Sequence, residues 1–222
     1  MPHTYSLQLL REAIEKAPKA FPEERRKMML AEHARLAADP NAALSQIEDA
    51  IVAFGKEIWP YRKAYQELHD EYGKDEPYLR EALSPATCAK YEQFRTGGGK
   101  LEDIRGGAQL EQTFTAEEKH EIEEAWLAAR ARAHKELDAA IAGEWRQKFE
   151  SSLAALRGKQ EEIEKRIAAL RVLAEESPKW SAEIVDKVKV FEEGWSGVER
   201  EVAEDDIRGE IEYYRGVIEV SI

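Results

Sequence analysis

Residues 149–174 read FESSLAALRGKQEEIEKRIAALRVLA, and they carry the most regular apolar pattern in this chain. Apolar residues, with one glutamine among them, recur at alternating steps of four and three. This spacing puts them on one face of an α-helix and is typical of a coiled-coil seam. We therefore predict a helix that packs against another helix along this face. The seam consists of Phe149, Leu153, Leu156, Gln160, Ile163, Ile167, Leu170 and Ala174.

A second seam follows after a break at Ser177-Pro178. Its residues are again three or four apart, so it predicts a second helix. Because only a few residues connect the two helices, we expect the second to fold back antiparallel on the first. Asp205-Asp206 predict the start of a last helix, packed on this hairpin. The second seam consists of Trp180, Ile184, Val188, Phe191, Trp195, Val198 and Val202.

Upstream of the hairpin, Thr115 and Glu118 predict the start of a long helix. A threonine cap with a glutamate three residues later is a capping box. No proline follows until Pro178, and a lone glycine in a helix interior costs only about 1 kcal/mol. The apolar series on either side of Gly143 are out of phase, so either the helix continues through Gly143 with a stutter or it breaks there. We expect the continuous helix.

The first half of the chain is expected to form shorter helices. Asp39-Pro40 predict a helix start, and Trp59-Pro60 predict a kink or a break within a later helix. Five glycines lie between positions 97 and 107, and glycine weakens helices. We read this stretch as a flexible loop.

Together these patterns predict an all-α fold in two parts. Residues 1–95 form a small N-terminal helical bundle, and residues 96–114 form a flexible Gly-rich linker. Residues 115–222 form an elongated antiparallel coiled-coil helical hairpin with a C-terminal helix.

The composition is that of an acidic protein. The chain has 222 residues, 45 of them Asp or Glu and 33 Lys or Arg, which gives a formal net charge of −12. Such a charge repels phosphate backbones, so we expect no nucleic-acid partner. With Cys88 as its only cysteine the chain forms no internal disulfide, and it has no apolar run of membrane-spanning length. We expect a cytoplasmic protein without a membrane partner.

One pair of adjacent residues, His69 and Asp70, points to a possible chemistry. With His33 located 36 residues upstream, the pair resembles the metal ligands of helical phosphohydrolases of the HD class. The resemblance implies a metal-dependent hydrolase that uses His33, His69 and Asp70. The charged side chains on both flanks of the pair instead favour a solvated helix face, so this hydrolase is the alternative interpretation.

The stretch GGGK at 97–100 has part of a phosphate-binding loop. Such a loop needs a glycine four residues before the Gly-Lys pair and a hydroxyl residue after it. Phe94 and Leu101 stand at those positions. We therefore expect no cofactor.

The predicted function is that of a non-enzymatic helical scaffold or protein–protein interaction protein. Seams one residue wide per turn usually need a partner helix to bury them, so we expect a protein partner, most simply a second copy in a homodimer. The predicted partner-binding residues are Leu153, Leu156, Ile163, Ile167, Leu170, Ile184, Phe191, Trp195 and Val198.

Overall fold

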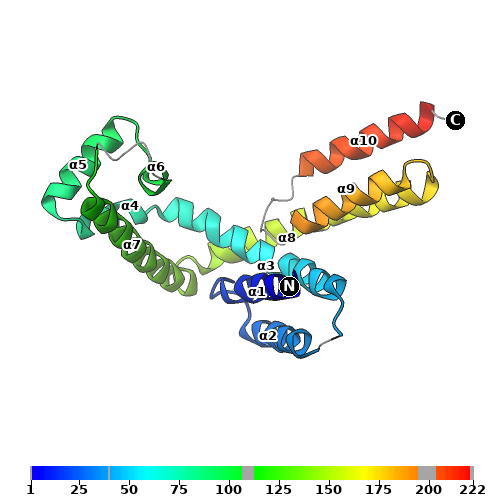
Figure 1. Ribbon diagram of the computed structural model, residues 1–222, viewed down its shortest axis with the longest axis horizontal. Helices are drawn as coiled ribbons and strands as arrows, with labels where there is room; N and C mark the ends of the chain where they lie inside the picture. The colour runs from blue at the N-terminus through cyan, green and yellow to red at the C-terminus, as the bar shows by residue number, and fades with distance from the viewer. Residues whose placement is uncertain (1, 40, 107–112, 195–203, 221–222) are drawn as a thin grey trace. The chain divides into compact units, whose positions relative to one another are not determined.

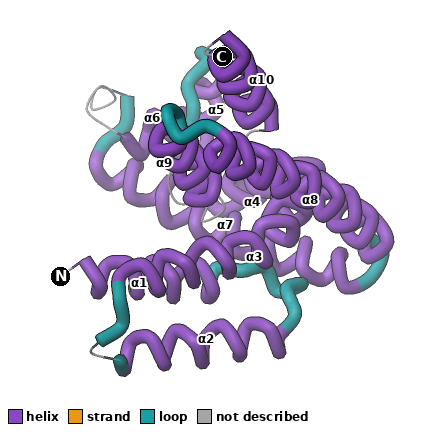
Figure 2. The backbone as a smooth tube through the Cα atoms, turned by 90° about the vertical axis from the view of Figure 1, so that its right-hand side faces the viewer, coloured by secondary structure: helices purple, strands orange, loops and turns teal. Residues whose placement is uncertain are grey.

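The computed structural model describes residues 2–39, 41–106, 113–194 and 204–220. In these ranges the chain forms helices and no strand (Figure 2), so the predicted all-α fold is confirmed. No helix within the same ranges is long and apolar enough to cross a membrane.

Contacts within the chain group it into two units. Unit 1 comprises residues 1–66 and 147–222, and unit 2 comprises residues 67–146. The separate folding of 1–95 and 115–222 stays a prediction.

Unit 1 begins with α1 (Pro2–Glu15) and α2 (Glu23–Ala38), which lie side by side (Figure 2). Arg26 of α2 donates hydrogen bonds to the carbonyls of Ile14, Ala17 and Pro18 at 3.0, 3.1 and 2.9 Å. The last carbonyls of a helix have no partner within it, so Arg26 satisfies the end of α1 and the turn after it. This contact fixes the connection between the two helices.

The third helix, α3 (Leu44–Tyr72), continues through Pro60, where the sequence predicts a kink or a break. Proline lacks an N–H, so Pro60 leaves the carbonyl of Lys56 without its helical donor. The side chain of Gln160 supplies the missing donor, with Nε2 at 2.9 Å from the Lys56 oxygen. The only polar residue of the first seam therefore replaces the hydrogen bond that Pro60 removes.

Two further helices of unit 1, α8 (Arg146–Glu176) and α9 (Ser181–Glu193), are joined by a short turn and lie side by side in Figure 1. Trp180 donates its backbone N–H to the carbonyl of Ser177 at 3.0 Å, which closes the turn. Arg171 and Glu192 form an ion pair of 2.7 Å between the two helices. The coiled-coil geometry of this hairpin stays a prediction.

The last helix, α10 (Glu204–Val220), packs on α9 (Figure 1). Its Tyr214 is buried and donates a hydrogen bond to Glu183 of α9 at 2.9 Å. Lys187 of α9 and Glu210 of α10 form an ion pair of 2.8 Å. The two contacts lie one turn apart, and the later residue of α9 pairs with the earlier residue of α10, so the two helices run antiparallel.

Unit 2 contains α4 (Asp75–Ala82), α5 (Pro85–Thr96), α6 (Leu101–Gly106) and α7 (Ala116–Ala142). The predicted capping box at the start of α7 is confirmed, because Thr115 and Glu118 exchange both hydrogen bonds. One apolar core holds the four helices together, with Leu79, Tyr91, Ile104 and Ile122 buried in it. This core extends along α7 from Ile122 to Ala133.

The prediction of one helix through Gly143 is wrong. Helix α7 ends at Ala142, and α8 begins at Arg146. Gly143 has φ −118° and ψ −109°, a conformation that no helix contains, and Trp145 then donates its N–H to the carbonyl of Ala140 at 2.8 Å. The Trp145 ring packs edge-on against Tyr72, with 5.6 Å between the centroids. This long-range packing competes with helix continuation at a glycine, where continuation is weakest.

Part of the predicted linker 96–114 is also helical, although the sequence predicts a flexible loop there. Gly98 has φ +88°, so it turns the chain after α5, and the carboxylate of Asp103 accepts the N–H of Lys100 at 2.8 Å at the start of α6. Ile104 of α6 and Phe114 are buried in the core of unit 2. Two apolar side chains thus anchor a glycine-rich stretch. Residues 107–112 lie outside the described ranges, and the linker's flexibility stays a prediction.

Candidate functional site

The candidate site lies in unit 2, where α3 ends. Gly73 adopts φ +61° and donates its N–H to the carbonyl of His69 at 3.0 Å, which ends the helix. The chain then turns directly into α4 and brings Asp75 to the His69 ring, with 3.2 Å between Nε2 and Oδ1. Asp70 lies on the other ring nitrogen, with 3.9 Å between Nδ1 and Oδ1. His69 therefore lies between two carboxylates and is hydrogen-bonded to Asp75.

A second histidine, His134 of α7, packs against His69 with 4.8 Å between the ring centroids. Burial lowers the pKa of His134, and the neighbouring His69 and Arg130 lower it further. A positive charge beside the partly buried His134 ring disfavours its protonation, so His134 takes up a proton at a lower pH than an ordinary histidine.

Glu76 of α4 joins α4 to α5. Its carboxylate accepts the hydroxyl of Tyr91 at 3.1 Å and forms ion pairs with Arg95 at 3.4 Å and Arg80 at 3.5 Å. Burial, together with the Glu76 charge, raises the pKa of Tyr91, so this hydroxyl stays a donor. Arg95 also donates to the carbonyl of Gly99 at 3.0 Å. These bonds position the guanidinium of Arg95 beside the start of α6.

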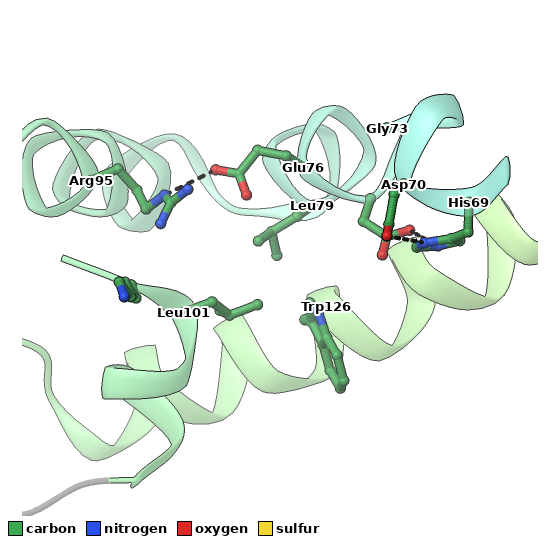
Figure 3. A pocket seen from close by; sticks show the side chains of 10 residues that line it. His69, Asp70, Gly73, Glu76, Leu79, Arg95, Leu101 and Trp126 are labelled. Atoms are coloured by element: carbon green, nitrogen blue, oxygen red, sulfur yellow. Dashed lines mark hydrogen bonds and ion pairs between the residues drawn. The ribbon is translucent and has the colours of Figure 1, made fainter. Parts of the chain in front are cut away.

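These elements surround a cavity of about 530 Å³. Figure 3 shows Leu79, Leu101 and Trp126 in its middle, with Arg95 at one end and the pair His69 and Asp70 at the other. Lys100 also lines the cavity and is adjacent in the chain to Gly99, which binds Arg95. The cavity therefore has one end with two cations, of which Arg95 is paired with Glu76, an apolar middle, and an acidic end with Asp70 and Asp75. It is lined by His69, Asp70, Gly73, Asp75, Glu76, Leu79, Arg95, Lys100, Leu101 and Trp126.

Nearby in unit 2, Glu136 of α7 accepts hydrogen bonds from the hydroxyls of Tyr72, at 2.9 Å, and of Tyr78. The same carboxylate forms an ion pair with Arg132 at 3.2 Å. The hydrogen bonds of the two tyrosines and of Arg132 lower the pKa of Glu136 to about 2. Arg132 also lies 3.8 Å above the Tyr78 ring. This network fastens the end of α3 and the start of α4 to α7, and so supports one side of the candidate site.

The three ligands of the alternative hydrolase lie in different surroundings. His33 belongs to unit 1, where its Nε2 lies 3.1 Å from the carbonyl oxygen of Leu7. His69 and Asp70 belong to unit 2, and the nearest partner of the His69 ring is Asp75. Among the described residues no group of three or more His, Cys, Asp or Glu side chains could hold a metal ion.

The predicted partner-binding residues lie in the interior of unit 1 wherever the structure describes them. Ile163, Leu170 and Ile184 have no exposed surface at all. Trp195 and Val198 lie outside the described residues. A partner of this hairpin would therefore meet other side chains of α8 and α9. The buried set is Leu153, Leu156, Ile163, Ile167, Leu170, Ile184 and Phe191.

Sequence reasoning found His69 and Asp70 but missed most of the cavity. No sequence pattern marks Trp126 as part of a cavity, and Lys100 falls within the predicted flexible linker. The one local signal was the sequence HDEYGKDE at 69–76, in which a glycine ends one helix and acidic residues begin the next. Such a turn places the acidic start of the second helix near the end of the first.

The chain matches none of the protein families, curated proteins or solved structures with which it was compared.

Proposed function

We propose that this chain is a non-enzymatic helical interaction protein that binds a protein partner at the cavity of unit 2. The observation that supports this function is the apolar middle of the cavity between two charged ends. Protein interfaces have an apolar centre rich in aromatic residues and arginine, surrounded by a polar rim. Trp126 and Leu101, which are partly buried, form such a centre over the buried Leu79, and Arg95 and Asp70 belong to the rim.

The polar groups of the cavity are arranged to hold helices in place. Glu76 joins α4 to α5 through Tyr91 and the two arginines, and Asp75 holds the ring of His69. Interactions of this kind make the cavity rigid before a partner arrives, which lowers the entropy lost on binding. A preformed binding surface is what an interaction protein requires.

The outer faces of the hairpin in unit 1 support the wider scaffold function. Val172 of α8 and Val185 of α9 expose 50% and 51% of their surface, and Val190 of α9 exposes 40%. A homodimer formed through these helices stays a prediction, as does a cytoplasmic location.

In-cell cross-linking tests the proposed function. Lys100, an exposed residue at the cavity, is replaced by the photo-cross-linking residue benzoylphenylalanine. Lys135 of α7 is the matched control, because it is exposed and lies about 140° around the helix axis from Ile122, which is buried in the core.

We expect irradiation to join position 100 to a distinct protein, and to give no such product from position 135. Equal products from both positions, or none from position 100, would contradict binding at the cavity.

A further inference from the structure

The order of charges along the cavity describes the partner. At the basic end Lys100 is exposed and Arg95 is paired with Glu76 at 3.4 Å, and at the other end lie Asp70 and Asp75, with Leu101 and Trp126 between the two ends. The side chain of Asp70 is 68% exposed, so solvent and a partner reach it. A partner therefore matches the cavity only if its acidic groups face the basic end and its basic groups face the acidic end.

We propose that the cavity binds a peptide segment of the partner whose residues run from acidic through apolar to basic. The inference rests on the proposed function. The acidic residues of the segment lie at Arg95 and Lys100, and its basic residues lie at Asp70 and Asp75. Its apolar side chain packs against the partly buried Leu101 and Trp126, above the buried Leu79.

The helix geometry sets the spacing of this segment. Asp75 and Leu79 are four residues apart on α4 and share one face, about 6 Å apart along the axis. An extended peptide advances about 3.3 Å per residue, so a basic residue two positions from the apolar anchor reaches Asp75. The sequence Glu-Glu-Ala-Leu-Ala-Lys-Lys has this spacing on both sides of its leucine.

An extended segment fits this site better than a small molecule with two charges. Small ligands are mostly enclosed by their pockets. Here both charged ends include exposed side chains, so a longer chain can continue past them into solvent. A carboxylate offers about four lone-pair positions, so Asp75 can accept from a lysine while it holds His69.

The test uses the full chain and labelled peptides with blocked ends. Fluorescence anisotropy measures the affinity of the mixed peptide EEALAKK and of three controls, EEALAEE, KKALAKK and QQALAQQ. We expect the mixed peptide to bind about three- to tenfold more tightly than each control, the range expected for a few partly exposed ion pairs. The preference should shrink in 1 M salt, where screening acts over about 3 Å.

Charge reversal in the protein makes the test specific. Lys100→Glu should make KKALAKK the preferred peptide, and Asp70→Lys should make EEALAEE the preferred one. The matched controls are Lys135→Glu and Glu124→Lys, both on the exposed side of α7, and neither should change the order. Glu124 is 70% exposed, close to the value of Asp70. All four variants alter exposed side chains, so their melting temperatures should match that of the parent.

Equal binding of all four peptides, or an unchanged order in Lys100→Glu, would overturn the inference. A partner cross-linked at position 100 would then leave the proposed function standing without this peptide. Self-association of the chain that Lys100→Glu abolishes would also overturn the inference, because a second copy would then occupy the cavity.

Discussion

The hydrogen bond between Gln160 and the carbonyl of Lys56 allows a decisive test of how α3 tolerates Pro60. Gln160→Met keeps the length of the side chain but removes the donor. The Lys56 oxygen then has neither a helical N–H nor a side-chain partner. Leaving a fully buried acceptor unsatisfied costs about 1–3 kcal/mol, and this hydrogen bond is partly buried, so the lower part of that range applies. The apolar methionine also gains some burial in the seam, so the single variant mixes two opposing effects.

Pro60→Ala separates these effects. Alanine at position 60 restores an N–H that can donate to the Lys56 carbonyl, as in an uninterrupted helix. In the Pro60→Ala background, Gln160→Met no longer leaves the Lys56 carbonyl without a donor, so the free energy of unfolding should change only through the packing of the methionine in the seam. We therefore expect the cost of Gln160→Met to be about 1–2 kcal/mol larger in the parent chain than in the Pro60→Ala background, within the usual range for coupled residues.

Urea unfolding of the four proteins, followed by circular dichroism, measures this coupling through the extrapolated free energies of unfolding. A double-mutant cycle cancels the cavity that Pro60→Ala creates, because the cavity is present in both members of one pair. Coupling below about 0.5 kcal/mol would mean that the two changes are independent. The side chain of Gln160 would then have no part in satisfying α3.

Three further predictions concern the seam and the two titrating groups of unit 2. Ile163 is fully buried, so Ile163→Ala should lower the free energy of unfolding by about 2–5 kcal/mol, whereas Lys159→Ala on the exposed face should change it by less than about 0.5 kcal/mol; chemical denaturation compares them, and equal effects would show that the assigned phase is wrong. The pKa of His134 is lowered in the folded chain, so the unfolded chain binds this proton at a higher pH, and the stability of the fold should decrease as the pH drops below about 6.5. In His134→Gln the melting temperature should depend less on pH below about 6.5. The pKa of Glu136 is lowered to about 2, so the stabilisation from its ionised carboxylate is complete above the ordinary pKa of 4.5 and is lost as the pH falls towards 2. Acid unfolding of Glu136→Gln should lack this pH dependence, and an acid transition equal to that of the parent would show that the network does not contribute to stability.

Local patterns were enough to predict the all-helical fold and the buried face of the first seam, but not the break at Gly143 or the helix α6. Every apolar member of the seam from Phe149 to Ala174 is buried, and the capping box at Thr115 has both of its hydrogen bonds. The physical reason is that helix periodicity and capping depend on residues within a few positions of each other. Such signals are complete in the sequence before the chain folds.

The tertiary structure decided which faces meet and what polar groups do there. Periodicity shows that a face is apolar, but it does not show which helix covers it. The break at Gly143 depends on Trp145 packing against Tyr72. The hydrogen bond that Gln160 donates to Lys56 is needed because of Pro60, 100 residues away in the chain. The cavity likewise needs the turn at Gly73 to bring Asp75 to His69, and α7 to bring His134 to the same ring. Contacts between residues so far apart in the chain follow from the packing of whole helices, which no short stretch of sequence specifies.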